Sequence, residues 1–179
     1  MTGPHVLPFL PAYIPPDVDL NQVLADVADD GVSVPPANVA DVPALRQVVD
    51  AAGKDGIDLK IVVIEHNPPI DTPLRDIATE VGKAHPDATV LAISPSFAGT
   101  YSTHIDRVTL EAGQDVAETG NPVQSANNFL SELTTQHFPW TPFTIVVVLG
   151  VVAAAVITRV LQVRGKRSAA TDVMSDTAD

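Results

Sequence analysis

A continuous apolar segment near the C-terminus constrains this chain more than any other feature. Between Phe143 and Val163 the only charged side chain is Arg159, and most other residues are valine, isoleucine, leucine, alanine or glycine. As an α-helix this segment is about 30 Å long, which is the thickness of the hydrocarbon core of a bilayer. Arg159 stands near its end, where a long side chain can reach the lipid headgroups. The sequence therefore predicts one transmembrane helix over residues 143–163, with the lipid bilayer as a partner.

The residues around this segment fit a membrane crossing. Trp140 stands where an interfacial aromatic residue is expected, and Pro139 and Pro142 stand where a helix begins. Gly150 and the alanines at 153–155 offer a small-residue face on which a second helix could pack.

The basic residues around the segment bear on its orientation. Four of them lie at its end or beyond it, namely Arg159, Arg164, Lys166 and Arg167, and none stands between Arg107 and Arg159. The positive-inside rule then places the C-terminal tail in the cytoplasm and the preceding domain outside the cell. Against this, the N-terminus lacks the basic start and unbroken apolar run of a signal peptide. A tail-anchored protein with a cytoplasmic domain stays as the alternative, and we favour the outward domain.

The region before the membrane segment is strongly acidic. It holds six of the ten Lys and Arg residues and nineteen of the 22 Asp and Glu residues, a formal charge of −13 in a chain whose total is −12. A surface of this charge repels phosphate backbones, so we expect no nucleic acid partner. The chain has no cysteine, which excludes disulfides, thiolate metal ligands and cysteine nucleophiles.

Composition divides the rest of the chain into four segments. Five prolines predict an extended arm over residues 1–16, whose apolar side chains we expect to lie against the domain. A globular domain is predicted over residues 17–135 and a linker over residues 136–142. A short charged tail follows the membrane helix over residues 164–179.

Apolar residues at helical spacing predict four helices in the domain. The first follows Asp19, the second follows Asp41, the third follows Asp71 or Thr72, and the last follows Asn121. We expect each of these residues to cap its helix, because short polar side chains accept hydrogen bonds from the first free backbone amides.

Two short β-branched runs predict strands buried on both faces, one in "LKIVVIEHN" and one in "TVLAIS". With the helix between them they form a βαβ unit, so we expect parallel strands and a right-handed crossover. Past Ser94 the pattern leaves two alternatives, a strand through Val108, Leu110 and Ala112 or a helix. The predicted fold class is α/β, a small sheet containing the βαβ unit and flanked by helices, plus the C-terminal transmembrane helix.

Polar side chains follow both predicted strands where ligands bind in an open α/β sheet. Glu65 and His66 follow the first strand, and Asp71 lies in the loop after it. Carboxylates and imidazole together can hold a divalent cation, so these three residues are the candidate metal ligands.

Further polar residues follow the second predicted strand. They are Ser94, Ser96, Tyr101, Ser102 and His104, which we expect at the same edge as a ligand-binding surface. The alternative is ordinary loop chemistry, in which serine and aspartate hold turns and helix ends, and we favour it. No phosphate-binding loop, nucleophile elbow or H-E-x-x-H motif occurs in the sequence.

The stretch "LKIVVIEHNPPIDTPLRDIATEVGKAHPDATVLAISPS" resembles the core of the TPM domains, small α/β domains usually displayed outside a membrane and often followed by one membrane helix. The stretches "DTPLRDIATEVGKAHPDATVLAISPSFAGTYST", "TLEAGQD" and "NFLSELT" also resemble a family of uncharacterised single-pass membrane proteins of mycobacteria, corynebacteria and related actinobacteria. The resemblance implies a membrane-anchored accessory domain. For some TPM domains it also implies weak phosphatase activity and cation binding.

Together these observations predict a membrane-anchored accessory domain of the cell envelope, regulatory or scaffolding and not catalytic. Its partner would be an envelope protein, and it would need no cofactor. The alternative is a weak metal-dependent phosphatase of the TPM type, with a divalent cation at Glu65, His66 and Asp71 beside Ser94.

Overall fold

The computed structural model describes residues 12–135 and 140–176, with side chains described over residues 12–135 and 143–162. The chain separates into two compact units, residues 1–135 and residues 136–179, which are treated one at a time below.

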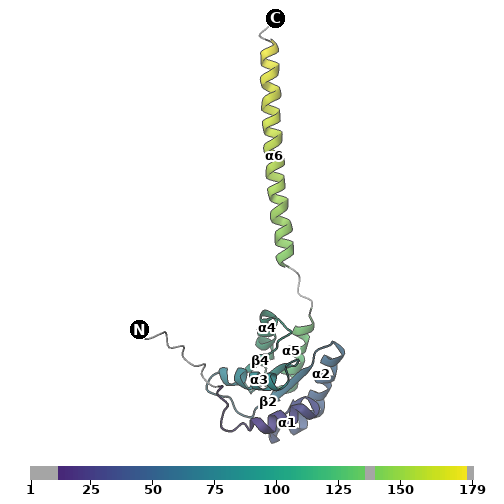
Figure 1. The fold of residues 1–179 in the computed structure, drawn as a ribbon, viewed down its shortest axis with the longest axis vertical. Helices are drawn as coiled ribbons and strands as arrows, with labels where there is room; N and C mark the ends of the chain where they lie inside the picture. Colours follow the sequence, from purple (N-terminus) through teal and green to yellow (C-terminus); the bar gives the residue numbers. More distant parts are fainter. Residues whose placement is uncertain (1–11, 136–139, 177–179) are drawn as a thin grey trace, which may run out of the picture. The chain divides into compact units, whose positions relative to one another are not determined.

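The first unit is an α/β domain whose helices surround a four-stranded sheet (Figure 1). In chain order its elements are α1 (Leu20–Asp30), β1 (Val32–Ser33), the 3-10 helix η1 (Pro36–Asp41), α2 (Val42–Lys54), β2 (Leu59–Val63), α3 (Thr72–Ala84), β3 (Thr89–Ile93), β4 (Ala98–Tyr101), α4 (Arg107–Ala117) and α5 (Pro122–Thr134). The predicted α/β class, with a βαβ unit in a small sheet flanked by helices, is confirmed.

The strands lie in the order β1-β2-β3-β4, and the first three are parallel. β4 runs antiparallel to β3, with Ala98 beside Ile93 and Tyr101 beside Val90. A tight turn joins them, in which the Ser94 backbone amide donates to the Phe97 carbonyl at 2.9 Å. The chain therefore reverses after β3, and the residues that directly follow β4 lie at the opposite end of the strands.

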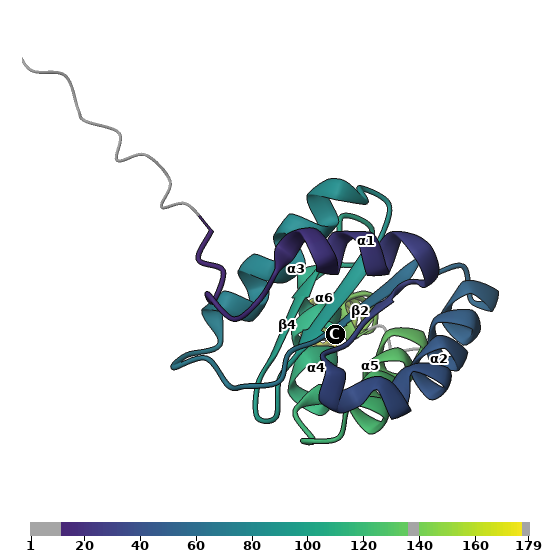
Figure 2. The same ribbon diagram turned by 90° about the horizontal axis from the view of Figure 1, so that it is seen from below.

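Helices cover both faces of the sheet, as Figure 2 shows. Apolar residues of α2, α4 and α5 pack on one face, and those of α1 and α3 pack on the other. The connections from β1 to β2 and from β2 to β3 step across the sheet in the same direction, but α2 and α3 lie on opposite faces. The two crossovers therefore have opposite hands, and one of them departs from the usual right-handed rule.

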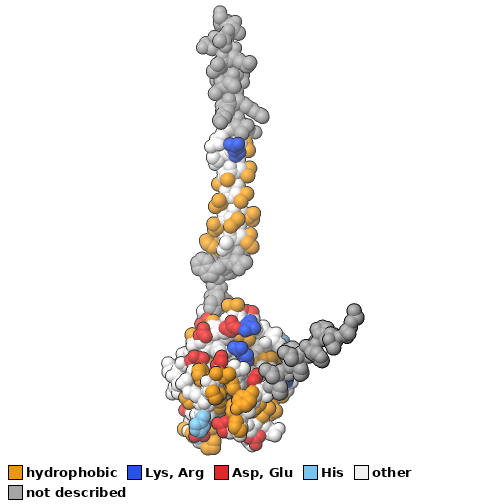
Figure 3. All heavy atoms as spheres, turned by 90° about the vertical axis from the view of Figure 1, so that its left-hand side faces the viewer, with side chains coloured by type: hydrophobic (Ala, Val, Ile, Leu, Met, Phe, Trp, Pro, Cys, Tyr) orange, Lys and Arg blue, Asp and Glu red, His pale blue; other side chains and the backbone are white. Residues whose placement is uncertain are grey.

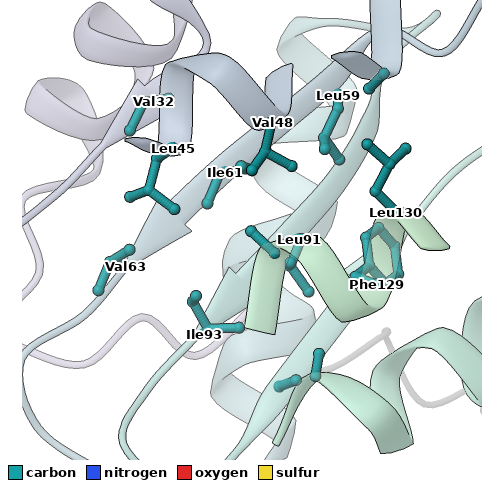
Figure 4. Packing of buried hydrophobic residues seen from close by; sticks show 14 of the residues in the cluster. Val32, Leu45, Val48, Leu59, Ile61, Val63, Leu91, Ile93, Phe129 and Leu130 are labelled. Carbon is teal, nitrogen blue, oxygen red and sulfur yellow. The ribbon is translucent and has the colours of Figure 1, made fainter. Parts of the chain in front are cut away.

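The larger core lies between the sheet, α2 and α5 (Figure 4). Ile61 and Leu91 point into it from the strands, while Leu45 from α2 and Phe129 from α5 close it. All four side chains are fully buried. Burying side chains of this size contributes about 1.5–3 kcal/mol each, which lets a domain without disulfides stand on its core.

Side-chain caps fix three of the helix starts. The Asp19 carboxylate accepts from the backbone amides of Asn21 and Gln22, and the Asn121 side chain accepts from that of Gln124, as predicted. Asp106 caps α4 in the same way. Asp41 was expected to cap α2, and Asp71 or Thr72 to cap α3. Asp41 and Asp71 stand at the cap positions without a side-chain cap bond, because both already have helical backbone angles that keep the carboxylate from folding back, and Thr72 is already inside α3. Asp41 instead accepts from the Asn38 side chain at 3.0 Å.

The region after Ser94 contains both a strand and a helix. Of the two alternatives for Val108 and Leu110, the helix is correct: in α4 Leu110 is buried, whereas Val108 points to solvent. The strand lies earlier, in β4, where Gly99 allows the chain to approach α3. A Cβ atom at Gly99 would stand 2.5 Å from the backbone nitrogen of Arg75.

The last part of the proline-rich arm lies against the domain. Ile14 packs on the apolar cluster that contains residues of α1 and α3, as does Val18 just after the arm, and the Tyr13 amide donates to the Asp76 carboxylate at 2.8 Å. The earlier apolar residues of the arm, such as Phe9, lie outside the described residues.

The second unit contains a single long helix, α6 (Trp140–Asp176). Its stretch Phe143–Gln162 has a mean hydropathy of 2.5, and none of it is buried inside the protein. The predicted span ends one residue later, at Val163. The α-helical backbone continues beyond it, so residues 164–176, predicted only as a charged tail, belong to the same helix.

Candidate functional site

One opening of the domain lies at the carboxyl ends of β1 and β2. It is a cavity of about 280 Å³, which we call the carboxylate cleft. Four carboxylates and one imidazole line it, contributed by Asp17, Asp19, Asp26, Glu65 and His66. The expectation that ligand-type side chains gather at the ends of the parallel strands therefore holds for Glu65 and His66.

The floor of the carboxylate cleft is apolar. Val23 of α1 and Val63 of β2 line it, together with Ile64, and all three are buried. A ligand that entered would place an apolar part on the floor and polar groups among the carboxylates, which is the usual composition of a binding pocket.

Several of these carboxylates already serve the fold. Asp19 caps α1, and Asp26 accepts from Gln22 Nε2 at 2.6 Å and from Ser33 Oγ at 2.9 Å. His66 Nδ1 lies 3.7 Å from the Asp17 carboxylate, an ion pair only when the imidazole is protonated. These contacts hold α1 against the end of β1 and fix the wall of the cleft.

Asp71 belongs to a different part of the edge from Glu65 and His66. It stands at the start of α3, where its backbone carbonyl accepts from the Leu74 amide at 2.9 Å. It does not line the carboxylate cleft. Among the described side chains no group of three or more His, Asp and Glu residues stands close enough to hold a metal ion. The three predicted ligands are thus not gathered into one metal site.

Ser94 and Ser96 lie at the predicted edge and hold a loop together there. Asn67 Oδ1 accepts from the Ser94 hydroxyl and from the Ser96 amide, both at 2.8 Å, and Asn67 Nδ2 donates to the Ser96 hydroxyl at 2.9 Å. The Ser94 hydroxyl therefore donates to an amide oxygen and not to a general base, and this geometry does not activate it as a nucleophile.

A smaller cavity of about 60 Å³ lies on the other side of β2, between the strand ends and the start of α5. Two of its polar residues are engaged, since Asn121 caps α5 and Ser125 Oγ is 2.8 Å from the Thr119 hydroxyl. It is too small for more than a few atoms.

Tyr101, Ser102 and His104 lie at the opposite end of the strands, so their placement beside Glu65 and Ser94 is wrong. The Ser102 hydroxyl is 3.0 Å from that of Thr89, where β3 begins, and His104 Nε2 is 3.4 Å from the Asp87 carboxylate. The antiparallel course of β4 is the cause, because it carries the chain back to the amino ends of β2 and β3.

Sequence reasoning missed Asp17 and Asp26 as residues of the site, and it assigned Asp19 only as a cap. These residues lie before and on α1, and they line the cleft because α1 packs beside β1, where Ser33 donates to Asp26. β1 has two residues and is too short for a pattern of alternation to reveal. The only signal was the β-branched pair Val32 and Val34 in "GVSVPP", just after the first helix.

Comparison with known proteins places the chain among membrane proteins. The family model described as membrane protein Rv1476 matches residues 13–172. The curated membrane protein Rv1476 of Mycobacterium tuberculosis (strain ATCC 25618 / H37Rv) is 59% identical over 172 residues, covering 94% of this chain and 91% of the relative.

Among solved structures, the chain is similar to the solution NMR structure of the N-terminal domain of the cg2496 protein from Corynebacterium glutamicum. The two share 12% sequence identity with a TM-score of 0.49, over 69% of this chain and 86% of that one.

Proposed function

Since this chain belongs to the family of the mycobacterial membrane protein Rv1476, we propose that it is a single-pass membrane protein whose α/β domain binds an envelope protein and does not itself catalyse a reaction. The family prediction made from the sequence, an actinobacterial membrane protein family, is confirmed. The binding role, the cell-envelope location and the likeness to TPM domains are parts of the proposal.

The observation that carries the proposal is the coexistence of two differently built units in one chain. The domain buries its own apolar core, whereas the stretch Phe143–Gln162 of α6 has none of its surface buried inside the protein. A helix of this composition is stable in lipid and poorly soluble in water, so it serves as an anchor. An anchored domain with its own core is the architecture of a tethered binding module.

The carboxylate cleft supports binding over catalysis. It is open, its floor is apolar, and Asp19 and Asp26 are held by hydrogen bonds that fix their positions. Such a cleft suits a basic side chain, whose aliphatic stem would lie on Val23 and Val63 while its charged end meets the carboxylates. The partner we propose therefore presents a Lys or Arg residue to this edge of the sheet.

For orientation we propose the domain outside the cell and the tail in the cytoplasm. The basic residues Arg164, Lys166 and Arg167 follow the span, and the region before it carries a charge of −13. Basic residues are retained on the cytoplasmic side during insertion, which favours this direction.

Two single-cysteine variants test the orientation, because the chain has no cysteine of its own. Ala84→Cys places a thiol at the exposed end of α3, and Ser168→Cys places one in the tail. With the outer barrier opened, a membrane-impermeant maleimide should label Ala84→Cys in intact cells and Ser168→Cys only after lysis. The reverse pattern would make the protein a tail-anchored cytoplasmic adaptor and move its partner to the other side of the membrane.

The binding role has its own test. In vivo photocrosslinking from position 22, on the rim of the cleft, should trap a defined protein. Asp26→Asn with Glu65→Gln should reduce that product, whereas Asp87→Asn, an exposed carboxylate at the other end of the strands, should not. An unchanged product in the double variant would remove the cleft from the interface.

The second candidate, a metal-dependent phosphatase, is favoured by one observation, the gathering of Glu65 and His66 with three further carboxylates in the cleft. A cation that binds the native state must raise its unfolding temperature by mass action. If millimolar calcium, magnesium or manganese raises the unfolding temperature of the native chain and not that of Glu65→Gln, the result favours the phosphatase over the binding module. No shift would exclude the cation site.

A further inference from the structure

A second cleft lies along the outer edge of β4, away from the carboxylate cleft. Its volume is about 200 Å³, and we call it the arginine cleft. Its polar lining comes from three elements, namely Arg75 and Thr79 of α3, Thr100 and Tyr101 of β4, and Arg107 and Gln114 of α4. The function proposed above does not involve this cleft. Tyr101 lies in it, although the sequence had predicted Tyr101 at the carboxyl ends of the strands beside Ser94.

The position of β4 at the end of the sheet creates this cleft. β4 pairs with β3 on one side only, while α3 packs on one face of the sheet and α4 on the other. The absence of a side chain at Gly99 lets β4 approach the first turns of α3, which brings Arg75 to the rim beside the strand. Tyr101 is held in turn by Gly82, where a Cβ atom would overlap its ring.

Arg107 is oriented by a neighbour on its own helix. Its Nε donates to the Glu111 carboxylate at 2.6 Å, and this hydrogen bond raises the pKa of the guanidinium. Because the contact uses Nε, the two terminal nitrogens of Arg107 stay available as donors. A guanidinium held in this way presents two parallel N–H groups in a fixed direction, which matches the oxygens of a phosphate or carboxylate.

Arg75 differs from most other cations of the domain. Arg46, Lys60, Lys83 and Arg107 each form an ion pair with a carboxylate. Within the described part of the chain, Arg75 has neither a hydrogen bond nor an ion pair from its side chain. The cleft therefore holds one unpaired guanidinium and one whose terminal nitrogens are free.

The local charge of the arginine cleft is opposite to that of the domain. Two of the six basic residues before the span line it, against one carboxylate, Glu111. At physiological salt the Debye length is about 8 Å, so the distant carboxylates that make up the charge of −13 are largely screened at this position. An anion in contact with both guanidinium groups is therefore attracted mainly by their positive charge.

From this arrangement we propose that the arginine cleft binds a phosphate group. Arg75 and Arg107 supply charge-assisted hydrogen bonds from two sides, and the hydroxyls of Thr79 and Tyr101 lie in the same lining. A phosphate accepts several donors at once, which favours it over a carboxylate in a cleft with donors on three elements. The group comes either from a free phosphate compound or from a lipid headgroup with a terminal phosphate.

The test measures thermal unfolding of the full-length chain in maltoside micelles. In the first arm inorganic phosphate is added with chloride adjusted to hold ionic strength constant. In the second arm short-chain phosphatidic acid is mixed into the micelles. A native-state ligand raises the unfolding temperature in a saturable way, and the midpoint of that rise gives the dissociation constant. The arm that responds at the lower concentration identifies the source of the phosphate.

Arg75→Gln and Arg107→Gln should each weaken the binding by about tenfold or more, because each removes charge-assisted hydrogen bonds to the ligand. Lys83→Gln is the matched control, since it removes the same charge from an exposed position on α3 that does not line the cleft. Its response should equal that of the native chain. The proposal is overturned if neither arm raises the unfolding temperature of the native chain. It is also overturned if both arginine variants bind the ligand as tightly as the native chain does, or if Lys83→Gln weakens binding as much as the arginine variants do.

Discussion

The α/β domain and helix α6 are built from the same apolar residue types and expose them to opposite extents. In the domain, Val62 and Leu91 are fully buried, whereas in α6 Val152 is 54% exposed and Leu149 is 63% exposed. In Figure 3 apolar side chains follow one another along the coloured part of α6, while acidic and basic side chains are spread among apolar ones over the visible face of the domain. The two units are thus suited to two solvents. The domain gains stability by hiding apolar surface from water, and α6 by placing it in lipid.

The largest expected effect is that of a charge placed in the span. Val152→Lys should raise the free energy of membrane insertion by about 2.5–3.5 kcal/mol, because lysine is costly near the centre of a bilayer. The fraction of the protein resistant to carbonate extraction should fall. Val152→Leu should leave that fraction unchanged. In the domain, Val108→Lys should also be tolerated, because Val108 is 76% exposed to water. An equal tolerance of Val152→Lys would contradict the assignment of α6 to lipid.

The second largest expected effect is that of a methyl group added to a glycine, which should destabilise the domain and leave α6 unchanged. A Cβ atom at Gly99 would lie 2.5 Å from backbone atoms of α3, whereas at Gly150 it would meet nothing within 4 Å. Gly99→Ala should therefore destabilise the domain by about 1–3 kcal/mol, measured by urea unfolding of the full-length chain in micelles. Gly150→Ala should change neither that stability nor the membrane fraction. A loss of stability in Gly150→Ala as large as that in Gly99→Ala would contradict the open space at Gly150.

The smallest effect concerns the start of α4 and depends on pH. Hydrogen bonds from the Thr109 hydroxyl and amide lower the pKa of Asp106 below its usual value of 3.8. A carboxyl with a depressed folded-state pKa stabilises the protein above its unfolded-state pKa, and this contribution is lost as the pH falls through the folded-state value. Asp106→Ala should therefore lower the urea midpoint at pH 7, and the difference from the native chain should shrink below pH 3.8.

The control for this prediction is Asp106→Asn, which keeps an acceptor at the cap and carries no titrating group. Its urea midpoint relative to that of Asp106→Ala should not depend on pH in this range. If Asp106→Ala lost the same stability at pH 7 and well below pH 3.8, the ionised cap would not be the source of the difference.

The predicted helices show how far local pattern reaches. Apolar residues at helical spacing identified α1, α2, α3 and α5, because a helix that covers a sheet must place its apolar side chains on one stripe. The strands β2 and β3 were recognisable for a similar reason, since each is largely buried on both faces and contains an unbroken apolar run, residues 61–64 and 90–93. In these elements the burial of each residue follows from its neighbours in sequence.

The elements that were not predicted are those whose existence depends on distant residues. β1 has two residues and forms because β2 offers it a parallel partner, with Val32 beside Ile61. β4 contains Gly99, which weakens any strand pattern and is explained only by the backbone of α3 pressed against it. Local propensity carries no information on either contact.

By itself, the sequence determined that the chain has an acidic α/β domain and one apolar helix long enough to cross a bilayer. Both follow from composition and from the spacing of apolar residues, which can be read within a short stretch of the chain. Only the tertiary structure decided which polar residues meet. The parallel pairing of β1 with β2 brings α1 with Asp26 to the same cleft as Glu65. The antiparallel course of β4 moves Tyr101 and His104 away from them and places Tyr101 in the arginine cleft with Arg75 and Arg107. The reason is that strand direction is set by hydrogen bonding between distant segments, and reversing one strand moves the residues that directly follow it to the other end of the sheet.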